Sequence, residues 1–173
     1  MKKSCCFVCQ KLPWIYIENS RECERIKDFL YIQTEKLIRD FGVTRFISGM
    51  ERGAETYAAE IVLRLKKEYP VTLECVIPWE EQAAAWPESD RDRYFDIISK
   101  SDTETMLQYR YTDDCCQKRN RYMVDQSRHV IAVWHSEKVR TSGTIQYAIG
   151  KRRHIHLIDP VRLTATPSIT VWK

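Results

Sequence analysis

The chain alternates short apolar runs with longer segments in which apolar residues recur every three or four positions. A short apolar run is typical of a β-strand, and the longer spacing is typical of an amphipathic helix. Gly42, Gly49, Pro70 and Pro78 separate the segments, as residues that end helices and strands do. The pattern predicts strands at Ser4–Cys9, Thr44–Ser48, Val71–Ile77, Thr103–Gln108, His129–Trp134 and His154–Ile158. It predicts helices at Arg21–Asp40, Ala54–Tyr69, Ser89–Lys100, Cys115–Ser127 and Ser142–Arg152, one helical turn at Glu80–Ala85, and a further strand in the tail to Lys173.

Regular alternation of strands and helices indicates an α/β fold. Parallel strands joined by crossover helices fit this pattern, with helices on both faces of the sheet. The apolar run Val130–Trp134 agrees, because a strand covered on both faces needs no polar positions. We expect a Rossmann-like three-layer α/β/α architecture with a mostly parallel sheet. No linker, repeat or low-complexity segment divides residues 1–173, so we expect one domain.

Composition narrows the class of protein. The 173 residues are 43% hydrophobic and 30% charged, which is ordinary for a globular protein and argues against disorder. The formal net charge of +4 is too small to favour a nucleic-acid partner, which usually needs a clustered basic face. No apolar run approaches the roughly 18 residues that cross a bilayer, and the apolar start breaks at Gln10-Lys11, too early for a signal peptide. We expect a cytoplasmic protein without a membrane partner, and a homo-oligomer stays open.

Seven cysteines, two pairs of them adjacent, do not suit a secreted disulfide framework. Reduced thiols are the simpler interpretation, and a zinc site at Cys5, Cys6 and Cys9 is the alternative. Adjacent residues of a strand point to opposite faces, and no second Cys-x-x-Cys pair supplies further ligands. We therefore predict no metal site. The three histidines that fall at or within predicted strands are expected to be structural: His129, His154 and His156.

In an open parallel sheet, ligands bind beyond the carboxyl ends of the strands, so the loops there carry the candidate chemistry. The first loop, Ser48–Glu55, contains Gly49 and Gly53, which let a ligand approach the backbone closely. Glu51 and Glu55 in this loop could accept hydrogen bonds from ribose hydroxyls, or serve as weak candidates for catalytic groups. The alternative is a tight turn with an acidic helix start.

The second candidate segment is Cys116–Asp125. Arg119 could form a forked pair with a phosphate, and Asn120 offers both donors and acceptors to a base or ribose. Lys118 and Arg121 complete a local basic cluster, and Asp125 is offset from Asn120 around the helix. The alternative is a solvated basic helix face, which fits Lys118 and Arg121 better than Arg119 and Asn120.

The third segment follows the most apolar strand and ends in Ser142-Gly143-Thr144, where a helix starts. Backbone amides and hydroxyls of these residues could hold a phosphate at the helix N-terminus. An ordinary Ser or Thr N-cap is the alternative.

Four segments of the chain resemble the YpsA-like family of the SLOG superfamily, which also contains the DprA and LOG proteins. They are Phe46–Met50, Ala58–Ile61, Gln117–Asp125 and Ile131–Trp134, and the similarity extends from about Ser4 to Pro160. The resemblance implies a Rossmann-like fold, a bacterial source and a nucleotide-derived ligand such as ADP-ribose or NAD. Carried over by that resemblance, the ligand loops fall on Gly49, Gly53, Glu55, Arg119, Asn120, Asp125, Ser142, Gly143 and Thr144.

The chain also departs from these families. After its first strand the family usually has Thr-Gly-His-Arg-Pro, where this chain has Val8–Trp14, and the family more often has Asp where this chain has Glu55. The LOG hydrolases carry Pro-Gly-Gly-x-Gly-Thr-x-x-Glu, of which only Gly143-Thr144 remains here, and Tyr147 stands at the position of the glutamate.

Three functions follow from the residues and the resemblance. The first is binding of a nucleotide-derived ligand at the carboxyl edge of the sheet, as a sensor, with no certain cofactor and with any enzymatic activity left open. The second is hydrolysis of an N-glycosidic bond in a nucleotide, with Glu51 or Glu55 as the acid or base. The third is DprA-like nucleic-acid binding, which the modest net charge favours least.

Overall fold

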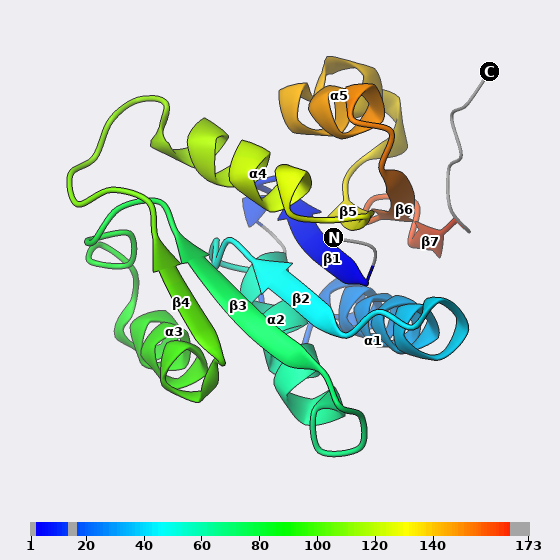
Figure 1. The fold of residues 1–173 in the computed structure, drawn as a ribbon, viewed down its shortest axis with the longest axis horizontal. Helices are drawn as coiled ribbons and strands as arrows, with labels where there is room; N and C mark the ends of the chain where they lie inside the picture. Colours follow the sequence, from blue (N-terminus) through cyan, green and yellow to red (C-terminus); the bar gives the residue numbers. More distant parts are fainter. Residues whose placement is uncertain (1–2, 14–16, 167–173) are drawn as a thin grey trace.

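The computed structural model describes residues 3–13 and 17–166, and these form one seven-stranded sheet with helices on both sides (Figure 1). The strands are β1 Ser4–Cys9, β2 Arg45–Ser48, β3 Thr72–Ile77, β4 Thr103–Met106, β5 His129–Val133, β6 His154–Asp159 and β7 Thr164–Ala165. The helices are α1 Arg21–Phe41, α2 Ala54–Leu65, α3 Glu88–Lys100, α4 Cys115–Asp125 and α5 Gly143–Gly150, with a short 3-10 helix at Ser136–Thr141. Every predicted strand and long helix is present.

The strand order is β4-β3-β2-β1-β5-β6-β7, and all pairs are parallel except β6 with β7. The chain moves outward from β1 to β4 in one direction, and then returns to place β5 against the other side of β1. The order therefore reverses between β1 and β5, which is where open α/β sheets bind ligands. The expected α/β, Rossmann-like fold with a mostly parallel sheet is confirmed.

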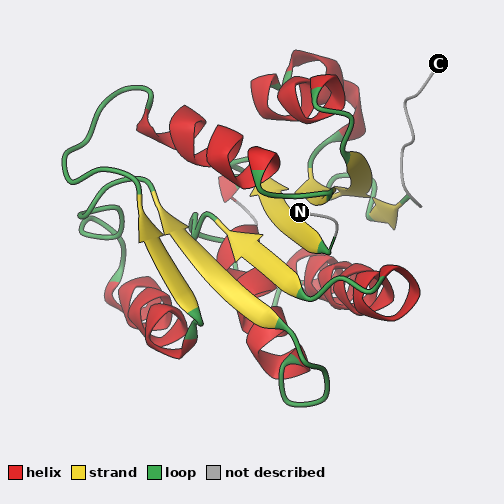
Figure 2. Ribbon diagram, in the orientation of Figure 1, coloured by secondary structure: helices red, strands yellow, loops and turns green. Residues whose placement is uncertain are grey.

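Two hydrophobic clusters fill the two sides of the sheet. Helices α1, α2 and α3 lie on one side of the sheet, and α4 and α5 lie on the other (Figures 1 and 2). Cys5 and Phe7 of β1 belong to the cluster on the first side, whereas Cys6 and Val8 belong to the cluster on the second. The adjacent cysteines thus point to opposite faces, as the pleat of a strand requires. No helix among the described residues combines the length and hydropathy needed to cross a membrane.

Local hydrogen bonds explain where the elements end. Ser20 caps α1 by accepting from the Cys23 amide at 3.1 Å, and Gly42 ends α1 in the left-handed region at φ 63°. The predicted second helix extended to Tyr69, but α2 ends at Leu65, and the amides of Lys67 and Glu68 beyond it bond to the carbonyl three residues back. The turn predicted at Glu80–Ala85 likewise consists of i to i−3 turns and not of α-helix. The tail beyond residue 166 and Trp14 lie outside the described residues.

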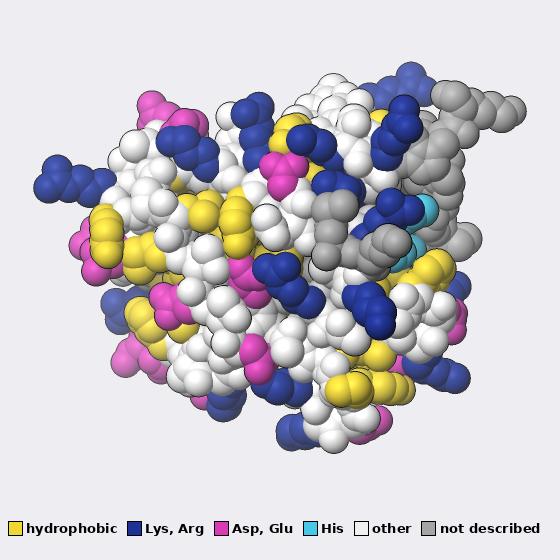
Figure 3. Space-filling model, in the orientation of Figure 1, with side chains coloured by type: hydrophobic (Ala, Val, Ile, Leu, Met, Phe, Trp, Pro, Cys, Tyr) yellow, Lys and Arg dark blue, Asp and Glu magenta, His cyan; other side chains and the backbone are white. Residues whose placement is uncertain are grey.

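On the α4 side of the sheet, helices cover β3 and β4 less completely than they cover the central strands. On the α4 side, Thr72 and Thr103 are exposed, and β4 is an exposed edge strand. Glu74 on that side is buried by polar contacts, from the Thr105 hydroxyl at 2.8 Å and the Tyr122 hydroxyl at 3.0 Å. Figure 3 shows acidic and basic side chains interspersed on the side that it views. The expectation of helices over both faces is confirmed, with α4 against Val76 of β3, although Thr72 and Thr103 on that side stay exposed to solvent.

Candidate functional site

A pocket of about 440 Å³ lies between the first turns of α4 and α5, and we call it the α4–α5 pocket. Its floor includes Trp134, which directly follows β5, so it lies near the β1–β5 reversal. Four predicted ligand residues line it, and the complete lining is Asp113, Cys116, Gln117, Asn120, Arg121, Trp134, Thr141, Ser142, Gly143, Thr144 and Tyr147.

One wall of the α4–α5 pocket is the start of α5. Ser142 is the N-cap, and its hydroxyl accepts a hydrogen bond from the Ile145 amide at 3.2 Å. The amides of Gly143 and Thr144 lie in the first turn and have no intrahelical acceptor. Amides in this position, at the positive end of the helix dipole, bind anions. The N-cap and the phosphate site, which the sequence presents as alternatives, are therefore compatible here.

The opposite wall is the start of α4. Cys116 and Gln117, which belong to its first turn, line the pocket. The N-cap residue Asp114 makes no side-chain hydrogen bond to the helix, so these amides also lack a capping partner. Two helix N-termini thus converge on one cavity, and both contribute positive potential to it.

Arg121 brings a full positive charge to the same pocket. Its guanidinium lies 5.4 Å from the centroid of the Tyr147 ring, and among the described residues it makes no ion pair with a carboxylate. The Tyr147 hydroxyl donates to both carboxylate oxygens of Asp125 at 3.0 Å, and Lys151 pairs with that carboxylate at 3.3 Å. Asp125 therefore acts on the pocket only through Tyr147.

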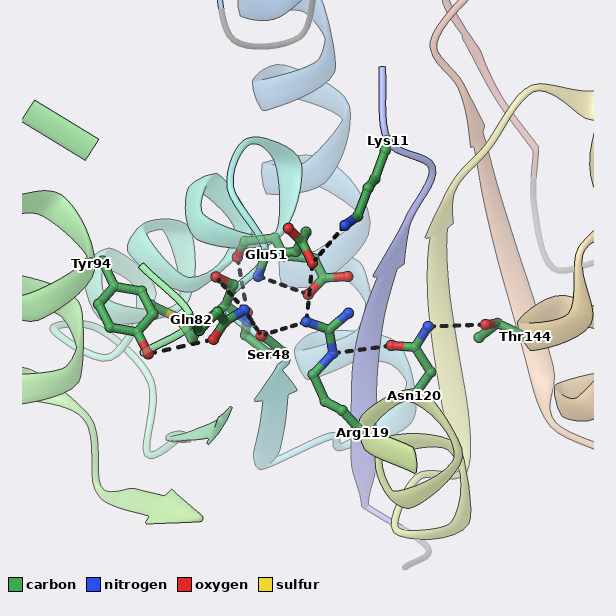
Figure 4. Close-up of polar contacts among 11 residues, drawn as sticks. Lys11, Ser48, Glu51, Gln82, Tyr94, Arg119, Asn120 and Thr144 are labelled. Carbon is green, nitrogen blue, oxygen red and sulfur yellow. Dashed lines mark hydrogen bonds and ion pairs between the residues drawn. The ribbon is translucent and has the colours of Figure 1, made fainter. Parts of the chain in front are cut away.

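A second polar cluster, the Arg119 cluster of Gly49, Glu51, Glu55 and Arg119, follows β2 (Figure 4). Arg119 is only 3% exposed, and its Nη1 donates to the carbonyl of Gly49 and to Glu51 Oε2, both at 3.2 Å. A Cβ on Gly49 would lie 2.7 Å from Cδ and Nε of Arg119, so only glycine fits at this position. Burial opposes the charge of Arg119, but the carboxylates of Glu55 and Glu51 outweigh it and raise its pKa.

Glu55 is enclosed beside Arg119 and is 2% exposed. Burial raises the pKa of its carboxyl above the usual value, although the Arg119 charge and backbone hydrogen bonds from Glu51 and Cys9 oppose the rise. Its Oε2 accepts from the Glu51 amide at 3.2 Å. The groups that the sequence offers to a ligand are, in this cluster, already bonded to one another.

Asn120 connects the Arg119 cluster to the α4–α5 pocket. Arg119 Nε donates to Asn120 Oδ1 at 3.1 Å, and Asn120 Nδ2 donates to Thr144 Oγ1 at 3.0 Å (Figure 4). A continuous path of hydrogen bonds therefore runs from Gly49 to the residue after Gly143. The two glycine-bearing loops therefore lie at the same carboxyl edge of the sheet.

The structure thus divides the predicted site residues into two groups. Asn120, Ser142, Gly143 and Thr144 line the α4–α5 pocket, whereas Gly49, Gly53, Glu51, Glu55, Arg119 and Asp125 do not. Gly53 is the N-cap of α2, with φ 99°, and its carbonyl accepts from the Tyr57 amide and the Thr56 hydroxyl. Any ligand role for the second group stays a prediction.

Sequence reasoning did not identify the parts of the pocket formed by Arg121, Trp134 and Tyr147. For α4 a signal was present, because residues four apart share a helix face. Arg119 lies four residues from both Cys115 and Met123, which are buried, whereas Arg121 lies four residues from the exposed Gln117. That spacing points Arg119 into the protein and Arg121 into the pocket.

Comparisons with known proteins complete the description. A model of the YspA SLOG family matches residues 13–163. A UPF0398 protein of Halalkalibacterium halodurans is 31% identical over 161 residues, which cover 91% of this chain and 84% of that protein. A UPF0398 protein of Oceanobacillus iheyensis is 34% identical over 77 residues, which cover 43% of this chain and only 42% of that protein.

Among solved structures, the DNA processing protein A (DprA) of Streptococcus pneumoniae has a similar fold, with a TM-score of 0.58 and 14% sequence identity. The match covers 90% of this chain and 50% of DprA, so the chain spans about half the length of that protein. At this identity the likeness concerns the fold alone.

Proposed function

Because this chain belongs to the YspA SLOG family, we propose that it binds a nucleotide-derived ligand of the ADP-ribose or NAD type in the α4–α5 pocket. The observation that carries the proposal is the convergence of two helix N-termini and Arg121 on one cavity. Amides at a helix start and a guanidinium both donate hydrogen bonds to phosphate oxygens. A phosphate or pyrophosphate group is the ligand part that this arrangement fits.

The rest of the pocket suits the remainder of such a ligand. Its volume of about 440 Å³ lies within the range of small-molecule sites, roughly 300 to 1,000 Å³. Trp134 and Tyr147 offer aromatic rings for a base, and Asn120 has a second amide proton and a second oxygen lone pair beyond its bonds to Thr144 and Arg119. Asp113, the one carboxylate among the residues that line the pocket, is exposed and suits a ribose hydroxyl better than a phosphate.

We propose binding, in the manner of a sensor, in preference to hydrolysis. Tyr147 lines the pocket at the position where LOG hydrolases carry a glutamate, and a phenol held by Asp125 is a poor general base at neutral pH. Glu55, the other candidate, is enclosed beside Arg119. DNA processing is the named role of DprA, and the observed pocket is a cavity better suited to a small ligand than to a strand.

The test compares ligand binding in the wild type with binding in Arg121→Gln. Calorimetry and thermal shift with ADP-ribose, NAD and AMP should show binding by the wild type, and a ligand at 100 times its Kd stabilises by about 2.7 kcal/mol. Loss of a charge-assisted hydrogen bond in Arg121→Gln should weaken binding by about tenfold or more.

Arg110→Gln is the matched control, because Arg110 is exposed and does not line the pocket. It removes the same charge and should bind like the wild type. Absence of binding by the wild type to any of these nucleotides at millimolar concentration would contradict the proposal. Equal losses of affinity in Arg110→Gln and Arg121→Gln would mean that only the net charge of the protein matters, which would contradict binding in the α4–α5 pocket.

A further inference from the structure

The hydrogen bonds between the Arg119 cluster and the α4–α5 pocket have a defined direction. A guanidinium can only donate, so the atom of Asn120 that faces Arg119 Nε must be the carboxamide oxygen. The carboxamide nitrogen then faces Thr144 Oγ1, and it can only donate. The orientation of the Asn120 amide therefore follows from the chemistry of Arg119.

This direction determines what the Thr144 hydroxyl can do. Because its oxygen accepts from Asn120 Nδ2, its own proton must point elsewhere. Among the described residues it donates to no protein acceptor, and Thr144 lines the pocket. The Thr144 hydroxyl is thus left as a donor next to the free amides of Gly143 and Thr144.

We propose that Arg119 is a positioning residue whose bond to Asn120 makes the Thr144 hydroxyl a hydrogen-bond donor into the α4–α5 pocket. The site then selects a ligand group that presents only acceptors, such as phosphate or pyrophosphate oxygens, over one that presents N–H donors. This inference rests on the proposed function, because it concerns the same pocket. It also gives the buried arginine a role other than the direct phosphate contact predicted from the sequence.

The geometry supports a firmly held relay. Gly49, Glu51 and Asn120 all accept from Arg119, and its aliphatic stem and Nε lie against Gly49. The Gly49 carbonyl also accepts from Gln82 Nε2 at 3.1 Å, which fixes that side of the cluster. Arg119 is therefore held in one orientation, and its bond to Oδ1 holds the Asn120 carboxamide in one orientation too.

The decisive variant is Asn120→Asp. A carboxylate accepts from both neighbours, so the Thr144 hydroxyl would turn toward residue 120 and stop donating into the pocket. ADP-ribose affinity should fall by about tenfold or more. Thr144→Val removes the hydroxyl, and its affinity for ADP-ribose should fall by a similar factor. Thr144→Ser keeps the hydroxyl, and its affinity should stay within about threefold of the wild-type value.

A new negative charge near a phosphate weakens binding by repulsion alone, so two controls separate the mechanisms. Gln117→Glu adds the same charge to the pocket lining without a bond to Thr144. In the Gln117→Glu/Thr144→Val double variant, the fold-losses of ADP-ribose affinity of the two single variants should therefore multiply. The affinity losses of Asn120→Asp and Thr144→Val should not multiply, because both changes remove the same hydrogen-bond donor from the pocket. The double variant should bind as Asn120→Asp does. Multiplying losses in the Asn120→Asp/Thr144→Val double variant would overturn the relay.

A ligand-free measurement keeps this inference separate from the proposed function. The side-chain amide signal of Asn120 can be assigned in a nitrogen-15 NMR spectrum by its absence from Asn120→Asp. Arg119→Lys should shift that signal strongly if Arg119 orients the amide, and Gln117→Glu should not. If the wild type binds no nucleotide, the proposed function fails while the shift still supports the relay. An unchanged Asn120 signal in a folded Arg119→Lys variant would overturn the relay even if ADP-ribose binds.

Discussion

The Arg119 cluster and the α4–α5 pocket begin from similar sequence and end in opposite states. Each combines a glycine-bearing turn after a strand with an arginine from α4. In the Arg119 cluster the arginine faces two carboxylates and a carbonyl, and these groups satisfy one another. In the α4–α5 pocket, Arg121 and the amides of two helix starts face a cavity. A charged glycine turn indicates a ligand site only where its donors are left without protein partners.

The largest expected effect comes from removing the arginine of the satisfied cluster. Arg119→Met removes the cation beside the buried Glu55 and leaves Glu51 paired with the exposed Lys11 at 3.5 Å, and breaking a buried pair in this way costs about 3 to 5 kcal/mol. Because the pKa of Glu55 is already raised, its carboxyl should take up a proton readily in the variant. The destabilisation relative to the wild type should therefore shrink as the pH falls from 7 to 4.5. Urea unfolding at both values measures it, and equal stability of variant and wild type at pH 7 would show that the cluster is not satisfied as described.

The next effect concerns a histidine cluster at the amino ends of β5 and β6. Its protonation lowers the stability of the wild type as the pH falls. His129 Nδ1 lies 3.2 Å from His156 Nε2, and burial lowers the pKa of each histidine to about 4. A lowered pKa means that the neutral form is favoured in the fold. Its stabilisation is present above the unfolded value of about 6.5 and is lost as the pH falls toward 4, by roughly 3 kcal/mol for one such histidine.

His156→Phe should therefore flatten the pH dependence of the unfolding free energy between pH 6.5 and 4, because it removes one of the two buried histidines. His129 and His156 both meet the Phe41 ring edge-on, so an aromatic replacement of His156 keeps the packing. A wild-type unfolding free energy that stays constant over this range would contradict the lowered pKa values.

A pair of alanine substitutions tests the comparison at its glycines. A Cβ on Gly49 would meet Arg119 at 2.7 Å and Glu55 Oε2 at 2.8 Å, so Gly49→Ala should destabilise by about 1 to 3 kcal/mol. A Cβ on Gly143 meets nothing within 4 Å, and alanine favours a helix by up to about 1 kcal/mol. Gly143→Ala should thus unfold at equal or higher temperature than the wild type. Thermal unfolding of the two variants side by side is the measurement, and the reverse order would refute the contrast between a filled and an open turn.

The smallest effect concerns Asp125, whose carboxylate accepts from the Tyr147 hydroxyl outside the pocket lining. Asp125→Asn should cost about 1 kcal/mol of stability or less, because the residue is only partly buried. It should weaken ADP-ribose binding no more than Tyr147→Phe does, and the double variant should match the weaker single variant. A larger loss for Asp125→Asn than for Tyr147→Phe in calorimetry would mean that Asp125 contacts the ligand itself.

Much of the fold could be predicted from residue patterns. The strand and helix at each place followed from apolar spacing, and Ser20 and Gly42 show why α1 starts and stops where it does. The exposure of Thr72 and Thr103 on the α4 side of the sheet was not predicted, because it depends on where the helices pack against β3 and β4. The helix start at Ser142-Gly143-Thr144 was predicted, and the burial of Arg119 could have been predicted from its spacing to Met123.

By itself the sequence determined the α/β alternation, the caps of α1 and the residues that reach the carboxyl edge, because periodicity and capping are local properties of the chain. Only the tertiary structure decided which of those residues stay available to a ligand. Glu51 and Glu55 face Arg119 because the loop after β2, α2 and α4 come together across the fold. Trp134, Arg121 and Tyr147 form a cavity because α4 and α5 begin side by side. Pairing and desolvation depend on distances between segments remote in sequence, and no local pattern contains those distances.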